Sequence, residues 1–312
     1  MSTDRTSNIA PHADTREAVH VVAASRARER ASTLRPWTKH TSTRSVIHPV
    51  MPKNPKYILV PVCFTLCAPL AALGQSAPAD YTLIGAGLRS RPAYDGAAAQ
   101  TIEAIPVLRY YGKPWFARTT QGVLEGGARI EPGTGFALGA QVVYEGGRSR
   151  SESAFLKDHN VEDIGVGASL GVHAELDRNI GSMPVTLLGR YRLNSEKAQG
   201  AQTDLRITAG VYGSGRLTAA VFAQATWANG KSTQSYYGIT PQQAAATGLA
   251  AYNAGSGLLF TSVGLQWGFD LDREWVLVGA VEARQLRGDA AASPLAEDRS
   301  STYVSVGLAY RF

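Results

Sequence analysis

The sequence predicts an all-β fold, a transmembrane antiparallel up-and-down β-barrel of about twelve strands, with ten strands as the alternative. Three observations predict it. Apolar and polar residues alternate along successive segments, and the connections between these segments are alternately short and long. The last segment is strand-like and ends with Phe312. A tilted strand of roughly ten residues crosses a bilayer with one face toward lipid and the other toward the lumen.

The first 50 residues are unlike the rest of the chain. They hold four of the six histidines and show no sustained apolar period, so they should not fold on their own. An export signal begins directly after them, and such a signal works only near the start of a chain. We therefore interpret Met51 as the initiator, and residues 1–50 as an upstream mis-start or a disordered extension.

Residues 51–74 are typical of an export signal. Lys53 and Lys56 supply a positive segment, and an apolar run over residues 57–73 follows it. Two prolines interrupt this run, which is shorter than the ~20 residues of a membrane-spanning helix. Small residues at positions 72 and 74 place the cleavage between Gly74 and Gln75, which leaves residues 75–312 as one outer-membrane barrel domain.

Charge and cysteine content narrow the partners of this domain. The whole chain has a net charge of +6, yet residues 75–312 carry 21 basic and 21 acidic residues. A neutral domain gives no support to nucleic acid as a partner. Both cysteines, Cys63 and Cys67, lie in the export signal. The barrel domain is therefore expected to have no disulfide, no thiolate metal site and no cofactor.

Period-two alternation predicts the strands one after another from Tyr81 onward. Clear runs cover residues 136–144, 164–176, 185–193, 204–213, 217–227, 259–269, 275–284 and 303–312. Both ends of such a barrel lie on the periplasmic side, so the number of strands is even. A further hairpin is therefore expected within residues 115–130, turning either at Gln121-Gly122 or at residues 125–127.

The connections predict which end of the barrel faces outward. Short connections cover residues 131–135, 177–184, 214–216 and 270–274, and long ones cover 146–162, 194–203, 229–257 and 285–302. Outer-membrane barrels have short periplasmic turns and long external loops. Aromatic residues near the strand ends predict belts at the two interfaces: Trp267, Phe269 and Trp275 at one, Trp227 and Tyr303 at the other. Alternation alone leaves a soluble β-barrel or sandwich as the alternative.

The longest loop contains a predicted short helix. Thr240 stands at the N-cap, Pro241 at the first helical position and Gln243 at the third, which is a capping-box arrangement. Gly248 is placed to end the helix. Two readings remain open: a helix that acts as a lid or plug at the mouth of the barrel, and a loop that is only well packed.

Few residues suggest catalytic chemistry, and we expect no enzyme activity. Ser169, His173 and Glu175 share the polar face of one strand, but the first two are ~13 Å apart along it, too far for a nucleophile and its base. His159 lies among Asp158, Glu162 and Asp163 without the spacing of metal ligands.

Two further groups of residues on the polar face are expected to have structural roles. Pairs of glycines, Gly85 with Gly87 and Gly165 with Gly167, are expected to let neighbouring strands or side chains approach closely. Inward charges are expected to pair with one another rather than to line an open pore, because side chains fill a narrow barrel. These charges are Glu103, Arg109, Arg190 and Arg192.

Five segments resemble the MipA/OmpV family of outer-membrane proteins. They are residues 105–116, 145–148, 161–171, 235–257 and 287–295, and the last two are the most specific. The residues that carry the last two segments are Tyr237, Gly238, Thr240, Gly248, Leu249, Tyr252, Asp289, Ser293 and Pro294. One departure concerns Ala97-Ala98, where the resemblance predicts a more polar loop.

The resemblance implies a barrel in the outer membrane of a Gram-negative bacterium, without enzymatic activity. Members of its MipA branch are described as scaffolds for a periplasmic lytic transglycosylase and a penicillin-binding protein that act on murein. A structural or scaffolding role is therefore expected, with outer-membrane lipid and the barrel-assembly machinery as further partners. The alternative is a small channel or a substrate-specific, porin-like pore.

The C-terminal segment is expected to be an assembly signal. Leu308, Tyr310 and Phe312 fall on one face of the last strand. In an unclosed barrel this strand is an edge, and an extended edge is captured by adding it to another sheet. The chain resembles other outer-membrane barrels in ending on an aromatic that the assembly machinery reads. The alternative is that Phe312 is one more interface aromatic.

Overall fold

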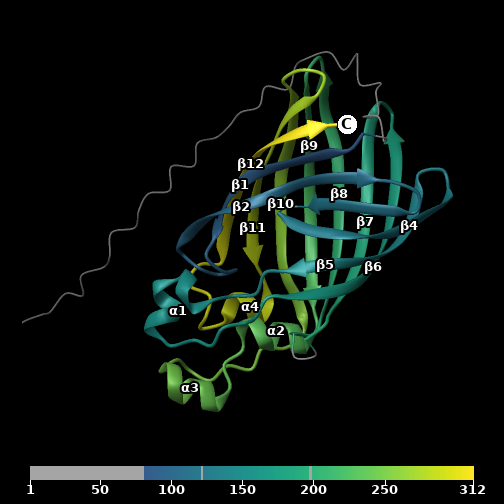
Figure 1. The fold of residues 1–312 in the computed structure, drawn as a ribbon. Coiled ribbons are helices and arrows are strands. Elements are labelled where there is room, and N and C mark those ends of the chain that lie inside the picture. The colour runs from purple at the N-terminus through teal and green to yellow at the C-terminus, as the bar shows by residue number, and fades with distance from the viewer. Residues whose placement is uncertain (1–80, 121, 197–198) are drawn as a thin grey trace, which may run out of the picture. The chain divides into compact units, whose positions relative to one another are not determined.

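The computed structural model describes residues 81–120, 122–196 and 199–312. These residues form a closed antiparallel barrel of twelve strands, which confirms the predicted fold class and strand number (Figure 1). The proposed export signal, its cleavage site and the first 50 residues lie outside the described residues. The strands are β1 (Leu83–Pro92), β2 (Gln100–Tyr111), β3 (Trp115–Thr120), β4 (Val123–Gly133), β5 (Phe136–Glu145), β6 (Gly167–Ile180), β7 (Met183–Asn194), β8 (Ala201–Ser214), β9 (Leu217–Ala228), β10 (Gly257–Asp270), β11 (Trp275–Leu286) and β12 (Ser300–Arg311).

Each strand pairs with its neighbours in sequence, and β1 closes the barrel by pairing with β12. The closing register runs from Leu83 opposite Arg311 to Ser90 opposite Val304. Gly85 and Gly87 lie within it, and a side chain at Gly85 would overlap the backbone of β12. The predicted close approach is therefore confirmed at this pair of glycines. It is wrong for Gly165, whose surroundings are open.

The expected extra hairpin consists of β3 and β4. Thr120 is opposite Val123 in the register and Gly122 is in the turn, which agrees with the first of the two predicted turns. The alternative turn at residues 125–127 is wrong, since Glu125 is paired within β4, opposite Val143 of β5. At six residues β3 is the shortest strand, and it pairs with β2 only through Arg109, Tyr110 and Tyr111.

The two faces of the barrel wall have opposite polarity. On β6, Leu170 and Val172 point outward and are more than half exposed, whereas Ser169 and His173 point inward and are buried. A soluble barrel or sandwich would bury its apolar face. Here the apolar face is outermost and the polar face lines the lumen, as in a transmembrane barrel.

Helices α1 to α4 lie at one end of the barrel, in the long connections, and the C-terminus lies at the other end (Figure 1). This division matches the predicted alternation of long loops and short turns. Some connections are shorter than expected, because β6 and β7 continue to Ile180 and Met183. Among the described residues, no helix has the length and apolarity that crossing a membrane requires. The helices are the 3₁₀ helix η1 (Arg150–Glu152), α1 (Ala154–Asp158), α2 (Gly230–Tyr237), α3 (Pro241–Thr247) and α4 (Gly288–Ala292).

Candidate functional site

The lumen is crossed by a network of buried ion pairs centred on Arg190. Its guanidinium, on β7, donates to the Glu125 carboxylate of β4 at 2.6 Å and to the Asp204 carboxylate of β8 at 2.8 Å. Glu125 and Asp204 are each 1% exposed. Asp204 also accepts a hydrogen bond from Thr226 of β9 at 2.8 Å. The network therefore joins β4 to β7, β8 and β9, with β5 and β6 between them in the wall.

A second arginine extends this network toward β6. Arg118, on the short strand β3, forms ion pairs with both Glu125 and Glu175. The amide of Gln141 donates to Glu125 at 3.0 Å. Buried carboxylates of this kind are stable only when paired and hydrogen-bonded, and here each has at least one arginine. The centre of the lumen is thus occupied by protein side chains.

The expected pairing of inward charges is confirmed for Glu103, Arg190 and Arg192. Glu103 accepts hydrogen bonds from two arginines of β1, Arg89 and Arg91, both at 2.8 Å, and Arg192 donates to Glu145 at 3.0 Å. Arg109 differs. Its guanidinium lies over the rings of Tyr81 and Tyr111, 4.6 and 5.6 Å from their centroids, and donates to the Tyr81 hydroxyl. The prediction of a carboxylate partner is therefore wrong for Arg109.

Ser169 and His173 do not form a nucleophile–base pair. The Ser169 hydroxyl donates to Glu145 at 2.7 Å. The His173 ring packs edge-on against Phe116, with centroids 5.2 Å apart, and neither of its nitrogens has a hydrogen-bond partner. His173 thus fills the lumen beside Gly139, where a side chain would overlap the ring.

The charged side chains near His159 do not form one cluster, because each contacts a different partner. The His159 ring lies against Phe155, Asp163 faces Arg150, and Glu162 accepts from the Gln243 amide at 3.1 Å. In the described ranges of the chain, no three histidine, cysteine, aspartate or glutamate side chains come together as metal ligands would.

The long loops pack together at one end of the barrel into a cap with its own apolar core. Residues of four connections meet there: Tyr94 after β1, Leu156 of α1, Ile239 after α2 and Leu295 after α4. Ala97 is part of this core. Its burial explains why the β1–β2 loop is less polar than the family resemblance predicts.

The family-signature residues are building blocks of this cap. The Ser293 hydroxyl donates to the Tyr237 carbonyl at 2.6 Å, and the Tyr252 hydroxyl donates to the Asp289 carbonyl at 2.9 Å. The Asp289 carboxylate accepts from the Gly255 amide at 2.7 Å. The remaining members lie in the same segments: Gly238 ends α2, Gly248 ends α3, Leu249 packs on the cap core, and Pro294 follows α4.

The predicted helix of the longest loop is present as α3. The capping box between Thr240 and Gln243 is formed, and Gly248 ends the helix in the left-handed conformation with φ 71°. No residue of α3 is buried, and α3 projects beyond the other helices (Figure 1). The plug reading is therefore wrong, and α3 covers the cap from outside.

Arg148 and Tyr236, which lie under the cap, were not singled out from the sequence. Arg148 donates to the Tyr236 carbonyl at 2.7 Å, and burial lowers the pKa of its guanidinium. Burial raises the pKa of Tyr236 to about 12, and the nearby Glu145 carboxylate adds to this shift. The pKa of Tyr237 is raised well above its usual value by burial and by the Asp95 carboxylate.

The prediction that Tyr303 is an interface aromatic is wrong, because Tyr303 contacts Asp95. We expected an interface aromatic, but Tyr303 points into the lumen, is 7% exposed and donates its hydroxyl to the Asp95 carboxylate. The Arg284 guanidinium lies 4.3 Å from the Tyr303 ring centroid and 3.1 Å from Asp95. Tyr303 therefore anchors the β1–β2 loop to the lumen, whereas Trp227 does face outward.

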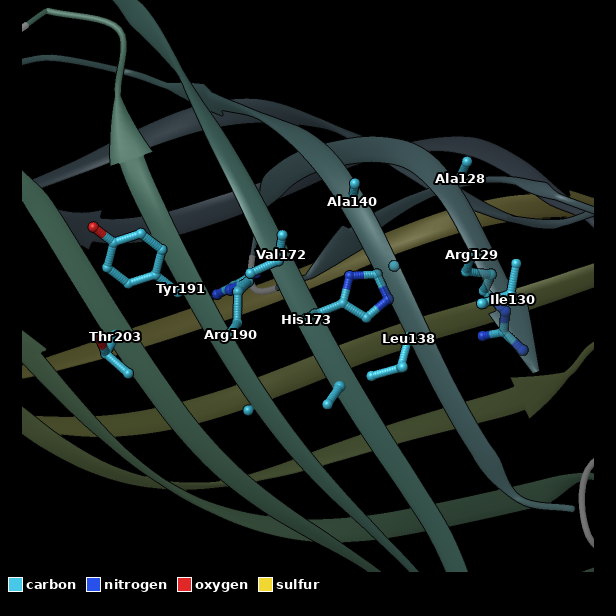
Figure 2. Close-up of a pocket in the computed structure, with 13 residues that line it drawn as sticks. Ala128, Arg129, Ile130, Leu138, Ala140, Val172, His173, Arg190, Tyr191 and Thr203 are labelled. Atoms are coloured by element: carbon cyan, nitrogen blue, oxygen red, sulfur yellow. The ribbon is translucent and has the colours of Figure 1, made fainter. Parts of the chain in front are cut away.

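One depression in the described residues lies on the outer face of the wall. It measures about 710 Å³ and crosses β4 to β8. Figure 2 shows the larger side chains of Tyr191, Val172, Leu138 and Ile130 arranged around it. Ala128, Ala140, Ala174 and Gly189 provide its low floor. Arg129, His173 and Arg190 also border it, but most of its lining is apolar, which suits hydrocarbon chains.

The residues of the predicted assembly signal lie at the end of the barrel opposite the cap (Figure 1). Leu308, Tyr310 and Phe312 point outward as expected, and Phe312 is 70% exposed. The Phe312 ring lies edge-on to Tyr310 with centroids 4.9 Å apart, and Tyr310 lies edge-on to Trp275 at 5.3 Å. These rings form an aromatic belt at the interface.

The chain was compared with known proteins and protein families. No curated protein matches the chain. Similar solved structures include an outer-membrane channel from Pseudomonas putida F1, with 8% identity and a TM-score of 0.40 over 79% of this chain and all of that one. A bacterial polysaccharide outer membrane secretin is similar, with 9% identity and a TM-score of 0.38 over 76% of this chain and all of the secretin. The family model described as MltA-interacting protein MipA matches residues 84–312. The chain is an outer-membrane β-barrel, and it belongs to the MipA family.

Proposed function

We propose that this barrel is a structural protein that holds murein-remodelling enzymes at the inner surface of the outer membrane. The observation that carries the proposal is the filled lumen, in which Arg190 bridges Glu125 and Asp204. A scaffold needs a rigid wall and no passage. The cap of packed loops at the outer end supports the same role.

The family description supports the class of partner. It names an interaction with MltA, and we propose a periplasmic lytic transglycosylase and a penicillin-binding protein as the enzymes that this chain holds. The surfaces available to them are the short periplasmic turns, such as residues 271–274 between β10 and β11, which are exposed. We propose no enzymatic activity for the barrel itself.

Site-specific photocrosslinking tests this role. A photoreactive amino acid at Arg273, on a periplasmic turn, should capture a lytic transglycosylase or a penicillin-binding protein, which mass spectrometry identifies. The matched control is the same amino acid at Ala250, which is exposed in an external loop and should capture neither enzyme. If neither enzyme is captured at Arg273 or at the other periplasmic turns, the scaffold proposal fails.

A small channel is the alternative function, and conductance separates it from the scaffold. The purified barrel in planar bilayers should give no steps in current, because ion pairs occupy the lumen. Regular steps that depend on solute type would instead support a porin-like pore. We also propose that the chain reaches the membrane through a cleaved signal over residues 51–74 and is inserted by the barrel-assembly machinery.

A further inference from the structure

One strand edge of the barrel is left without a partner. β2 pairs with β1 over ten residues, from Arg109 to Gln100, which is the length that a strand needs to cross a bilayer. On its other side, β2 pairs with β3 only at residues 109–111. Within the residues that the structure describes, no strand lies in register with residues 100–108 on that side.

The hydrogen-bonding direction of this edge follows from one contact. The Gly112 amide donates to the Trp115 carbonyl at 2.7 Å across the β2–β3 turn. Neighbouring residues of a strand point their backbone groups to opposite sides, so the even-numbered residues of β2 face away from β1. Gln100, Ile102, Ala104, Pro106 and Leu108 therefore present their backbone groups to the open side.

We place this edge at the depth of the hydrocarbon because its outward side chains are apolar and exposed. The outward side chain of Ile102 is 72% exposed, and those of Ala104 and Pro106 are exposed as well. Leu88 and Ala86, which are their partners on β1, also face outward and are exposed. Lipid tails offer no hydrogen bonds, so unpaired backbone groups persist at this depth only where water or protein reaches them.

Pro106 indicates that water, rather than another strand, covers this edge. Proline has no N–H, and within sheets it is confined to edges and bulges. It stands in the middle of the open edge, on the side where a further strand would pair. Proline at such a position is one way in which proteins prevent edge-to-edge addition. A second copy of this chain is therefore a poor partner for β2.

The tip of the β3–β4 hairpin does not seal the wall at this point. Gly122 lies so close to the Arg89 guanidinium that a side chain at Gly122 would overlap it, and Arg89 points into the lumen beside Glu103. Gly122 therefore lies on the lumen side of β1 and β2, and not beside β2 in the wall. Glu103 remains 30% exposed, whereas the Glu125 side chain in the centre of the lumen is fully buried.

We propose that the open edge of β2 borders a water-filled lateral opening in the barrel wall. Through it, the polar head of an amphiphile from the outer leaflet reaches the Arg89–Glu103–Arg91 cluster, while its acyl chain stays in the bilayer beside Ile102 and Pro106. Arginine side chains suit such a head because they present several hydrogen-bond donors in a fixed geometry.

Single-cysteine labelling tests the opening. Because residues 75–312 contain no cysteine, only the introduced thiol reacts. Ala104→Cys places a thiol on the open edge. Leu88→Cys is the matched control, because Leu88 is opposite Ala104 in the register, faces outward and lies between two paired strands. In reconstituted liposomes a water-soluble maleimide should label the first variant at least tenfold faster than the second.

Other outcomes of this labelling overturn the opening. Equal protection of both thiols means that the edge is covered, and disulfide-linked dimers of the Ala104→Cys variant mean that a second copy covers it. Equal labelling of both means that this level lies outside the bilayer.

Photocrosslinking tests the amphiphile. A lysophospholipid with a diazirine in its acyl chain should crosslink to residues 102–108, and Arg91→Gln should reduce the yield several-fold. A Lys157→Gln control in the external loop should leave it unchanged. Labelling of Ala104→Cys without crosslinks, or crosslinks unaffected by Arg91→Gln, would reject the amphiphile and retain only the opening.

Discussion

Arg190 and Glu125 are 65 residues apart in the sequence, and their charged groups meet inside the lumen at 2.6 Å. Both charged groups lie on the lumen faces of their strands, away from the lipid. Arg190 is 7% exposed and Glu125 1%. We expect the ion pairs of Arg190 with Glu125 and Asp204 to stabilise the folded barrel.

Removing one partner of this network should destabilise the barrel strongly. Arg190→Met leaves Glu125 and Asp204 as buried carboxylates without their shared cation, and breaking a buried pair in this way costs about 3–5 kcal/mol. Urea unfolding of the refolded barrel in lipid, followed by tryptophan fluorescence, measures the change. The control is Arg150→Met, which removes an exposed pair and should cost less than about 1 kcal/mol. Equal effects of the two substitutions would show that the network does not stabilise the barrel.

The cap should loosen at alkaline pH before the barrel does. The folded cap raises the pKa of Tyr236 to about 12, while an unfolded tyrosine titrates near 10. Its contribution is therefore complete below about pH 10 and is lost as the pH rises toward 12, because the unfolded state releases its proton first. Limited proteolysis between pH 8 and 12 should show cleavage in the loops over this window. Tyr236→Phe should make the cap more resistant there, and an unchanged profile would contradict the prediction.

Deleting Phe312 should slow assembly more than it weakens the finished barrel. The side chain is 70% exposed and packs edge-on against the Tyr310 ring, so the folded state buries little of it, and the deletion removes one backbone hydrogen bond to Thr82. Pulse–chase labelling should show unassembled precursor accumulating in the periplasm. Trp275→Ala is the comparison, since it should lower the stability of barrels that still form. An unchanged assembly rate and yield without Phe312 would leave it as an ordinary interface aromatic.

The external end of the barrel should be accessible on living cells. Ala250 is exposed in the loop between α3 and β10, so an epitope tag inserted there should bind antibody on intact cells. A tag at Arg273, on a periplasmic turn, should bind only after the outer membrane is broken. The reverse result would invert the orientation.

The mature protein should begin at Gln75. The small residues at positions 72 and 74 follow an apolar run and predict this cleavage. N-terminal sequencing of the outer-membrane form checks it directly. Recovery of peptides from residues 1–50 in the membrane fraction would contradict both the cleavage and the assignment of Met51 as the initiator.

The strands of the barrel wall were predictable because apolar and polar residues alternate along them, with one face toward lipid and the other toward the lumen. Val172 and His173 are neighbours in sequence, and their chemistry alone assigns one to lipid and the other to the lumen. The β3–β4 hairpin was also expected, from the even number of strands. Its exact turn was left open, because glycines at residues 122 and 126 offer equally good signals.

Contacts across the lumen were not predictable, since they depend on register and on strand tilt. Nothing near Arg190 in the sequence points to Glu125. The open edge of β2 was missed for a similar reason: alternation assigns Ile102 and Glu103 to faces and does not say where pairing stops. Tyr303 was misassigned because its place beside a long loop suggested an interface, although its phase relative to Val304 puts it inward.

The shared core of the cap has a consequence for how this protein presents itself outside the cell. Tyr94, Leu156, Ile239 and Leu295 come from four different connections and lie in one cluster. A change of size at any one of them must be matched by the others, so the loops cannot diverge independently over evolution. Antibodies raised against the folded surface should recognise epitopes assembled from several loops, and linear peptides copied from single loops should compete poorly for them.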